Sequence, residues 1–302
     1  HNGRHSFPTR RSSDLAAEFR HPWGAVVRFH DVEALALALA PSLLEFHLTD
    51  LDLDNGPDGL PSFEQQYSVH CPEYYHGRLL DLCAEDEDLR RWSVDIVRRA
   101  AERARWLRQF FPVADDPVLV IHPGAMDYDG FAPRPSRSEA FARSVEELRD
   151  LDDVRPVYEN LPPYPWYFSG QWYTSFFASP EDVARACGDL GLGLCWDVSH
   201  AQLWCRHAGT ELMDYFHAVR PWIRHLHVAD ASGTDGEGLQ VGRGEIDFDR
   251  LLPDLLALGL PLVIEIWLGH RSGGEGLAVA LSRLAQIDGL QDDAAQDYSG
   301  DL

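Results

Sequence analysis

Lysine is absent from this sequence, and all 26 of its basic residues are arginine. A lysine amine forms the Schiff base of pyridoxal-phosphate enzymes and completes the phosphate loop of Walker-type nucleotide hydrolases. The missing amine therefore excludes both kinds of chemistry from these 302 residues.

Cysteines are few, and long apolar runs are missing. The five cysteines are an odd number and include no CxxC pair, which argues against a disulfide framework or a zinc ribbon. A reducing compartment fits this cysteine usage, so we expect a cytoplasmic protein. No apolar run reaches the roughly 18 residues of a membrane span, and no signal peptide is visible.

The charge is strongly one-sided, with 26 basic against 49 acidic residues and a formal net charge of −23. Such a surface repels phosphate backbones and anionic lipids, so we expect neither nucleic acid nor membrane as a partner. With 45% hydrophobic residues, the chain has enough apolar material for a large core, and its length suits one large α/β barrel.

Both ends of the chain differ in composition from the middle. Residues 1–18 lack periodicity, and FPTRRSSDL within them resembles a translated sequencing-adapter sequence, so we expect a non-native or disordered segment. Residues 290–302 are polar and acidic, and we expect a fraying tail. The predicted folded domain is residues 19–289.

Short apolar runs alternate with amphipathic stretches along this domain. We expect helices at Asp31–Leu39, Arg90–Phe111, Glu139–Leu148, after the Ser179-Pro180 cap, at Phe248–Leu258 and at Gly276–Ile287. The apolar runs predict eight strands, namely Ala25–Phe29, Leu43–Leu48, Tyr67–His70, Val118–His122, Pro156–Asn160, Leu192–Val198, Arg224–Val228 and Pro261–Ile266. This alternation favours a single closed (β/α)8 TIM barrel. An open doubly wound sheet is the alternative, although no strand is followed by GxGxxG.

Ionisable residues lie in or just after most of these runs. They are Glu45, His47, His70, His122, Glu159, Asp197, His200, His227 and Glu265. Carboxylates that meet at one barrel mouth repel each other, and a cation relieves that repulsion. Because the candidate ligands are oxygen and imidazole, we expect Mn²⁺, Mg²⁺, Co²⁺ or Zn²⁺.

The order HPG, EN, DxxH, HxHxxD and a final strand glutamate resembles the xylose-isomerase-like barrel superfamily, which includes sugar isomerases and epimerases as well as endonuclease IV. In the epimerase branch four such residues hold one divalent metal, and the matching positions are Glu159, Asp197, His227 and Glu265. The first third of the chain is also similar to a barrel module associated with sialic-acid-synthase-type enzymes.

The endonuclease branch adds two histidines that match His70 and His122, which implies a second metal site. That branch also holds a third metal with the DxxH histidine, here His200, and an Asp-x-His pair. This sequence has Asp235 but no histidine two residues later, so we expect the third site to be absent.

The resemblance implies a sugar isomerase or epimerase that transfers protons through an enediolate, with Glu159 and Glu265 as acid and base and His200 on a substrate hydroxyl. The expected substrate contacts are Arg243, Trp166 and His122. The aromatic loop 162–177 is expected to touch substrate or another subunit, which favours a homo-oligomer. A dinuclear metal hydrolase and a barrel without turnover remain alternatives.

Overall fold

The structure is a computed structural model, and it describes the backbone of residues 19–298 and the side chains through residue 289. The segment 1–18, which we expect to be non-native or disordered, lies outside the described residues, as do residues 299–302.

Eight parallel strands close into a barrel in the order β1-β16-β13-β12-β8-β6-β3-β2. This closure confirms the single (β/α)8 barrel and contradicts the open-sheet alternative. Each predicted apolar run overlaps one barrel strand, with ends that differ by up to two residues. The strands are β1 (Trp23–Val27), β2 (Leu43–His47), β3 (Gln66–His70), β6 (Val118–Ile121), β8 (Arg155–Glu159), β12 (Gly193–Asp197), β13 (Ile223–Val228) and β16 (Leu262–Ile264).

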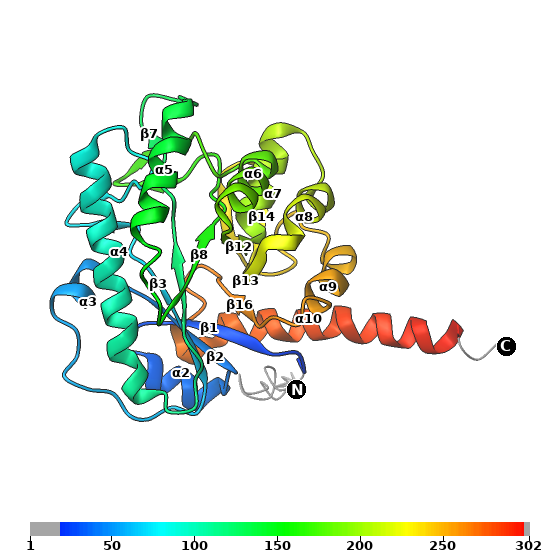
Figure 1. Ribbon diagram of the computed structural model, residues 1–302. Coiled ribbons are helices and arrows are strands. Elements are labelled where there is room, and N and C mark those ends of the chain that lie inside the picture. The colour runs from blue at the N-terminus through cyan, green and yellow to red at the C-terminus, as the bar shows by residue number, and fades with distance from the viewer. Residues whose placement is uncertain (1–18, 299–302) are drawn as a thin grey trace, which may run out of the picture.

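Helices surround this barrel, with α4 and α5 along one side and α6, α7 and α8 along another (Figure 1). The α-helices are α2 (Val32–Leu39), α3 (Asp50–Asp54), α4 (Glu87–Leu107), α5 (Pro135–Glu147), α6 (Pro180–Leu190), α7 (Val198–Ala208), α8 (Leu212–Val219), α9 (Phe248–Leu256) and α10 (Arg271–Tyr298). Short 3-10 helices follow α4 and α8, at Arg108–Phe110 and Arg220–Trp222. We did not predict α3, α7 or α8 from the sequence.

Helix α6 shows how local sequence sets an element's limits. The Ser179 hydroxyl accepts the backbone N–H of Asp182, and Pro180 occupies the first turn, where its missing N–H costs nothing. Gly191 ends the helix with a left-handed backbone at φ 67°. The capping expected from the sequence is therefore present.

Helix α10 is longer than we expected. Its backbone continues through Tyr298, so the helix extends into residues 290–298 of the predicted tail, and its C-terminal half projects beyond the barrel (Figure 1). Alanine and glutamine are good helix formers, and no proline interrupts these residues. Three left-handed residues, Ser272, Gly273 and Gly274, lie near its start, so regular helix begins after them.

Small antiparallel pairs of strands lie outside the barrel, in loops that follow its strands. These are β4 (Tyr74–Tyr75) with β5 (Arg78–Leu79), β7 (Met126–Asp127) with β11 (Tyr173–Thr174), β9 (Trp166–Tyr167) with β10 (Gly170–Gln171), and β14 (Asp230–Ser232) with β15 (Gly236–Leu239). The β7–β11 pair joins the loop after β6 to the loop after β8. The long loops are thus paired into ordered walls around the barrel mouth.

The described part of the chain contains no helix long and apolar enough to cross a membrane. All five cysteines are free and buried, as expected for small apolar side chains rather than a disulfide framework.

Candidate active site

A ring of eight side chains, one for each barrel strand, lies at the carboxyl end of the barrel. Its members occupy one of the last two positions of a strand or directly follow it, and they are Arg28, His47, His70, His122, Glu159, Asp197, His227 and Glu265. Each stands two residues after Val26, Glu45, Ser68, Val120, Val157, Cys195, His225 or Val263, respectively. Because side chains alternate across a strand, residues two positions apart point to the same side. The eight residues from Val26 to Val263 therefore form a layer directly beneath the ring. The period-two pattern of the strands therefore builds the site.

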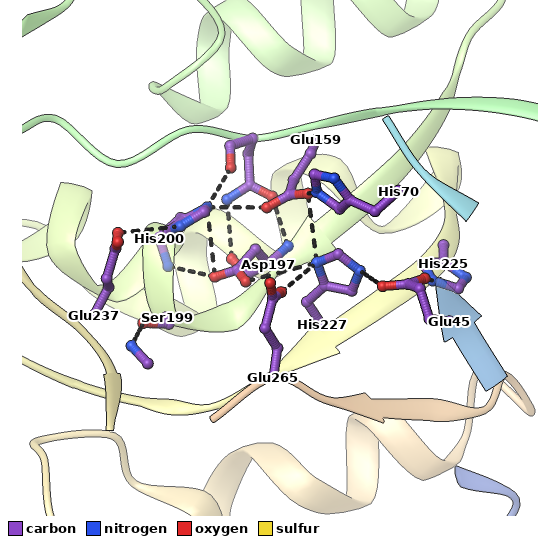
Figure 2. A network of polar contacts seen from close by, with 12 residues as sticks. Glu45, His70, Glu159, Asp197, Ser199, His200, His225, His227, Glu237 and Glu265 are labelled. Atoms are coloured by element: carbon purple, nitrogen blue, oxygen red, sulfur yellow. Dashed lines mark hydrogen bonds and ion pairs between the residues drawn. The ribbon is translucent and has the colours of Figure 1, made fainter. Parts of the chain in front are cut away.

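Four members of this ring are the residues that the resemblance matched to metal ligands, and the structure brings them together. Glu159, Asp197, His227 and Glu265 each offer a ligand atom, and these atoms lie within 4.8 Å of one another. His227 Nδ1 is 2.7 Å from Glu265 Oε2 and 3.4 Å from Glu159 Oε2, and Figure 2 shows the carboxylates grouped around this imidazole.

The donor set suits a divalent cation. His227 Nδ1 and Glu265 Oε2 are buried and close, yet neither has a hydrogen-bond partner with acceptable geometry. An ion bound between them satisfies both atoms, and three carboxylates with one imidazole are ligands for Mn²⁺, Mg²⁺, Co²⁺ or Zn²⁺. The side chains present therefore fit a metal.

The pKa values at this site differ among the carboxyl groups. Burial alone raises the pKa of Glu159, but His227 and His122 bring it well below its usual value. Burial likewise opposes the effect of His227 and His47 on Glu265, whose pKa falls to about 2. Asp197 has a pKa raised to about 7 by burial, with Glu159 and Glu265 adding to the increase. In the metal-free protein, protons on the imidazoles therefore balance the carboxylate charges. A bound cation would take the place of these protons.

Asn160 and the start of α7 fix Asp197 in place. The Asn160 amide donates to the Asp197 carbonyl at 2.9 Å, and its oxygen accepts the Asp197 N–H at 2.8 Å. Asp197 also caps α7, because its Oδ1 accepts the N–H of His200. One oxygen therefore caps the helix, while Oδ2 faces His227.

Glu45, in the layer beneath the ring, is fully buried and surrounded by imidazoles. It is hydrogen-bonded to His225 at 2.6 Å, to His47 at 3.0 Å and to the Ser68 hydroxyl at 2.8 Å. Its Oε1 also lies 2.8 Å from His227 Nε2 (Figure 2). Although burial favours a neutral carboxyl, His227 and His225 hold the pKa of Glu45 well below its usual value. Glu45 therefore supports His227 through the ring nitrogen that the other carboxylates do not face.

His70 and His122 also lie against Glu159. His70 Nε2 is 3.1 Å and His122 Nε2 is 3.3 Å from Glu159 Oε2. Burial lowers the pKa of His70, but the hydrogen bond and charge of Glu159 raise it to about 9. Glu73, which we did not single out in the sequence, forms a group of close ligand atoms with the two histidines.

His200 lies between Glu159 and a second carboxylate. Its Nδ1 is 3.0 Å from the Asn160 carbonyl and 3.1 Å from Glu159 Oε1, and its Nε2 is 3.3 Å from Glu237 Oε2. Glu237 occupies the position two residues after Asp235, where the endonuclease pattern has histidine. Among the described residues, no group of three or more close ligand atoms includes His200.

A cavity of about 300 Å³ opens above the ring. The loop after β8 forms one wall, with Pro162, Pro165, Trp166 and Tyr167. Phe168 and Ser169, at φ 53° and 64°, make the tight turn of the β9–β10 hairpin. Trp166, His122 and His200 all line the cavity, and Trp166 is 54% exposed.

Arg243, an expected substrate contact, does not line the cavity. Its loop is organised by the buried Asp230 carboxylate, which accepts the backbone N–H groups of Gly242, Arg243 and Gly244. The Arg243 side chain is exposed and is not among the residues that line the cavity. The guanidinium that does line it belongs to Arg28, which sequence reasoning missed. Its position two residues after Val26, at the end of an apolar run, was the available signal.

Comparisons with known proteins agree with this architecture. Two uncharacterised proteins of Methanocaldococcus jannaschii are each 25% identical to the chain, over 214 and 217 residues. Both alignments cover 68% of this chain, and they cover 72% and 64% of the relatives' own lengths.

Solved structures share the fold at low sequence identity. A xylose isomerase domain protein from Planctomyces limnophilus matches with a TM-score of 0.61 and 17% identity, over 91% of this chain and 99% of its own. A D-tagatose 3-epimerase-like protein matches with a TM-score of 0.56 and 20% identity, over 87% of this chain and 98% of its own. Endonuclease IV from Thermus thermophilus matches with a TM-score of 0.56 and 18% identity, over 88% of this chain and 99% of its own.

A family model described as a xylose isomerase-like TIM barrel matches residues 60–287, a range that contains every ring side chain except Arg28 and His47. The chain therefore belongs to the xylose isomerase-like TIM barrel family.

Proposed function

We propose that the protein is a divalent-metal-dependent isomerase or epimerase of keto-sugars or sugar acids. One observation carries the proposal, namely that the ligand atoms of Glu159, Asp197, His227 and Glu265 lie within 4.8 Å of one another at the base of the cavity. The similarity to epimerase-like and isomerase-domain structures supports it as a likeness of fold.

Two of these carboxylates suit proton transfer. Glu159 and Glu265 come from β8 and from the residue after β16, and β12 and β13 separate those strands in the barrel. Both pKa values are lowered, so both groups are ionised bases near neutral pH. A divalent ion, when bound, polarises the substrate carbonyl and stabilises an enediolate. For isomerisation, the glutamate that removes the proton beside the carbonyl can return the same proton to the neighbouring carbon. For epimerisation, the second glutamate must first take up a proton from a substrate hydroxyl or from solvent, and it then delivers this proton to the opposite face.

His200 and the aromatic wall hold the substrate in this scheme. His200 Nε2 lies beside Glu237 in the lining of the cavity and can donate to a substrate hydroxyl. Trp166 and Trp267 line the same cavity and are largely exposed, so their rings are available to cover a sugar and exclude water.

The test is solvent exchange. We expect the metal-loaded protein in D2O to exchange a C–H beside the carbonyl of its substrate, measured by NMR across a panel of ketoses and sugar acids. Product that forms without deuterium contradicts proton transfer through an enediolate.

A dinuclear metal hydrolase is the second candidate. His70 and His122 both lie close to the Glu159 oxygen that faces His227, so these two histidines would hold a second ion together with Glu159. Two ions in this arrangement lower the pKa of bound water. Metal analysis separates the candidates, because one tightly held ion per chain supports the isomerase and two support the hydrolase. A chain that holds no ion instead supports a barrel without turnover.

We further propose a cytoplasmic protein of carbohydrate metabolism that binds no nucleic acid and forms a homo-oligomer. The net charge of −23 opposes nucleic-acid binding. Exposed Phe168, in the turn of the β9–β10 hairpin, is suited to contact between subunits. Analytical ultracentrifugation tests the oligomer, and a DNA-binding titration tests the absence of nucleic-acid binding.

Glu45→Gln is expected to weaken metal binding by about 10- to 100-fold, as is typical for loss of a carboxylate behind a ligating histidine. The amide keeps the volume but removes the charge beside His227 Nε2. Isothermal titration with Mn²⁺ and Co²⁺ measures the affinity, and the Co²⁺ spectrum reports the ligand geometry. Glu33→Gln, on the exposed side of α2, is the matched control. Unchanged affinity in folded Glu45→Gln protein contradicts this role.

A further inference from the structure

Arg28 occupies an unusual position between two cavities. It directly follows β1 and lines both the main cavity and a second cavity of about 240 Å³. The two cavities share Arg28, His47, Glu265 and Trp267, so they adjoin at this point. Among the described residues, no other arginine lines either of these two cavities.

The Arg28 guanidinium has spare hydrogen-bonding capacity. Its only side-chain hydrogen bond within the described part of the chain runs from Nη1 to the Val27 carbonyl, at 3.2 Å. None of the ion pairs within 4.0 Å among these residues involves Arg28. The two buried arginines, Arg90 and Arg137, differ from Arg28 because each contacts a carboxylate directly. A partly buried guanidinium with free donors is a ready partner for an anionic group.

The charge of the cavity decides which anion fits. Five carboxylates line it, namely Glu73, Glu159, Asp197, Glu237 and Glu265. A divalent ion offsets two of these charges, and Arg28 offsets one more. A dianionic phosphate therefore meets a site that remains net negative and offers only one guanidinium. A monoanionic carboxylate matches the planar fork of one guanidinium and brings half the repulsion.

The walls set the direction in which the substrate lies. The main cavity has acidic and imidazole groups that suit a chain of hydroxyls. The second cavity is walled largely by aliphatic side chains, including Val26, Ile264, Ile266, Leu268 and Leu277. The hydroxylated carbons therefore belong in the main cavity, with the anionic end at the junction.

From these contacts we infer that the substrate is an unphosphorylated sugar acid whose carboxylate binds Arg28, while its hydroxylated carbons lie over the metal ligands. This inference rests on the proposed function, and it assigns the substrate contact to Arg28 in place of Arg243, the contact expected from the sequence.

Equilibrium binding tests the assignment without requiring turnover. The Mn²⁺-loaded full chain is titrated with D-glucuronate, D-glucose and D-glucose 6-phosphate, and then with the three corresponding galactose compounds. Within each series the three compounds differ only at carbon 6. We expect each uronate to bind at least about tenfold more tightly than the neutral hexose or the hexose 6-phosphate. A hydrogen bond to a charged group changes the dissociation constant by about this factor.

Three arginine variants identify the anchor. Arg28→Gln should lower uronate affinity by about 10- to 100-fold and leave affinity for the neutral hexose within about threefold. Arg28→Lys keeps the positive charge but loses the planar guanidinium, which can form two parallel hydrogen bonds with a carboxylate. We therefore expect a loss of uronate affinity smaller than that of Arg28→Gln. Arg185→Gln, on α6 and 61% exposed, changes the net charge equally and should behave as wild type. Metal content and Tm show that each variant is folded.

Several results overturn the inference. These are equal binding of hexose and uronate, preference for the phosphate, or loss of uronate affinity in Arg243→Gln but not in Arg28→Gln. The proposed function fails separately. A chain that binds uronates through Arg28 but exchanges no substrate proton refutes the reaction, whereas turnover of neutral ketoses with no uronate binding refutes only this inference.

Discussion

Glu159→Gln is expected to lower turnover by at least about 10³-fold, since a positioned acid or base contributes about 10² to 10⁴ and this residue is also a proposed ligand. Its carboxylate is buried and lies within 3.4 Å of His70, His122, His200 and His227. An amide neither accepts the substrate proton nor balances the charge of these imidazoles. The measurement is kcat together with the rate of deuterium uptake at the substrate carbon.

The design separates proton transfer from metal binding. If turnover returns at saturating metal, Glu159 acts as a ligand only, and the proton-transfer role is lost. Persistent inactivity at full metal occupancy supports that role. Glu181→Gln, exposed in the first turn of α6, removes an equal charge away from the cavity lining and should keep full activity. Circular dichroism confirms that both proteins fold.

The barrel could be predicted because its strands are short apolar runs that end in polar residues. In β8 and β12 the apolar residues are followed at the carboxyl end by Glu159 and Asp197, and this pattern is local in sequence. Helix α7 was missed because it begins directly at Val198, so its start merges with the apolar run that forms β12. Asp197 serves both as the last strand residue and as the helix cap.

Glu45 stood out in the sequence as an ionisable strand residue, but the supporting contacts of the site could not be predicted because they join distant parts of the chain. Glu45 and His225 are 180 residues apart in sequence, and only barrel closure brings them within 2.6 Å. Glu237 reaches His200 from a hairpin outside the barrel, whose position depends on tertiary packing. Arg243 was expected to contact substrate, but its loop is instead shaped by the buried Asp230 carboxylate, which accepts backbone N–H groups of that loop.

Removing the metal with a chelator is expected to abolish turnover and to lower stability more strongly at pH 9 than at pH 6.5. Burial lowers the pKa of His227, but Glu265, Glu45 and Glu159 raise it well above its usual value in the metal-free protein. His227 must lose this proton to bind an ion through Nδ1, so metal affinity should rise with pH. Turnover should return when Mn²⁺, Co²⁺, Zn²⁺ or Mg²⁺ is added back.

His70 contributes to the pH dependence of the metal-free protein. Its pKa is about 9 in the folded chain against 6.5 for the free side chain. The stability that its proton provides is complete below pH 6.5 and is lost as the pH rises through about 9. This shift corresponds to about 3 kcal/mol, counted once for the His70–Glu159 pair. Calorimetry of chelated protein at pH 6.5 and pH 9 measures the loss, and His70→Asn should make it smaller by the share that His70 contributes. A chelated wild-type chain with equal unfolding free energies at the two pH values contradicts the argument, because protons would then not be balancing the carboxylates that the metal is proposed to bind.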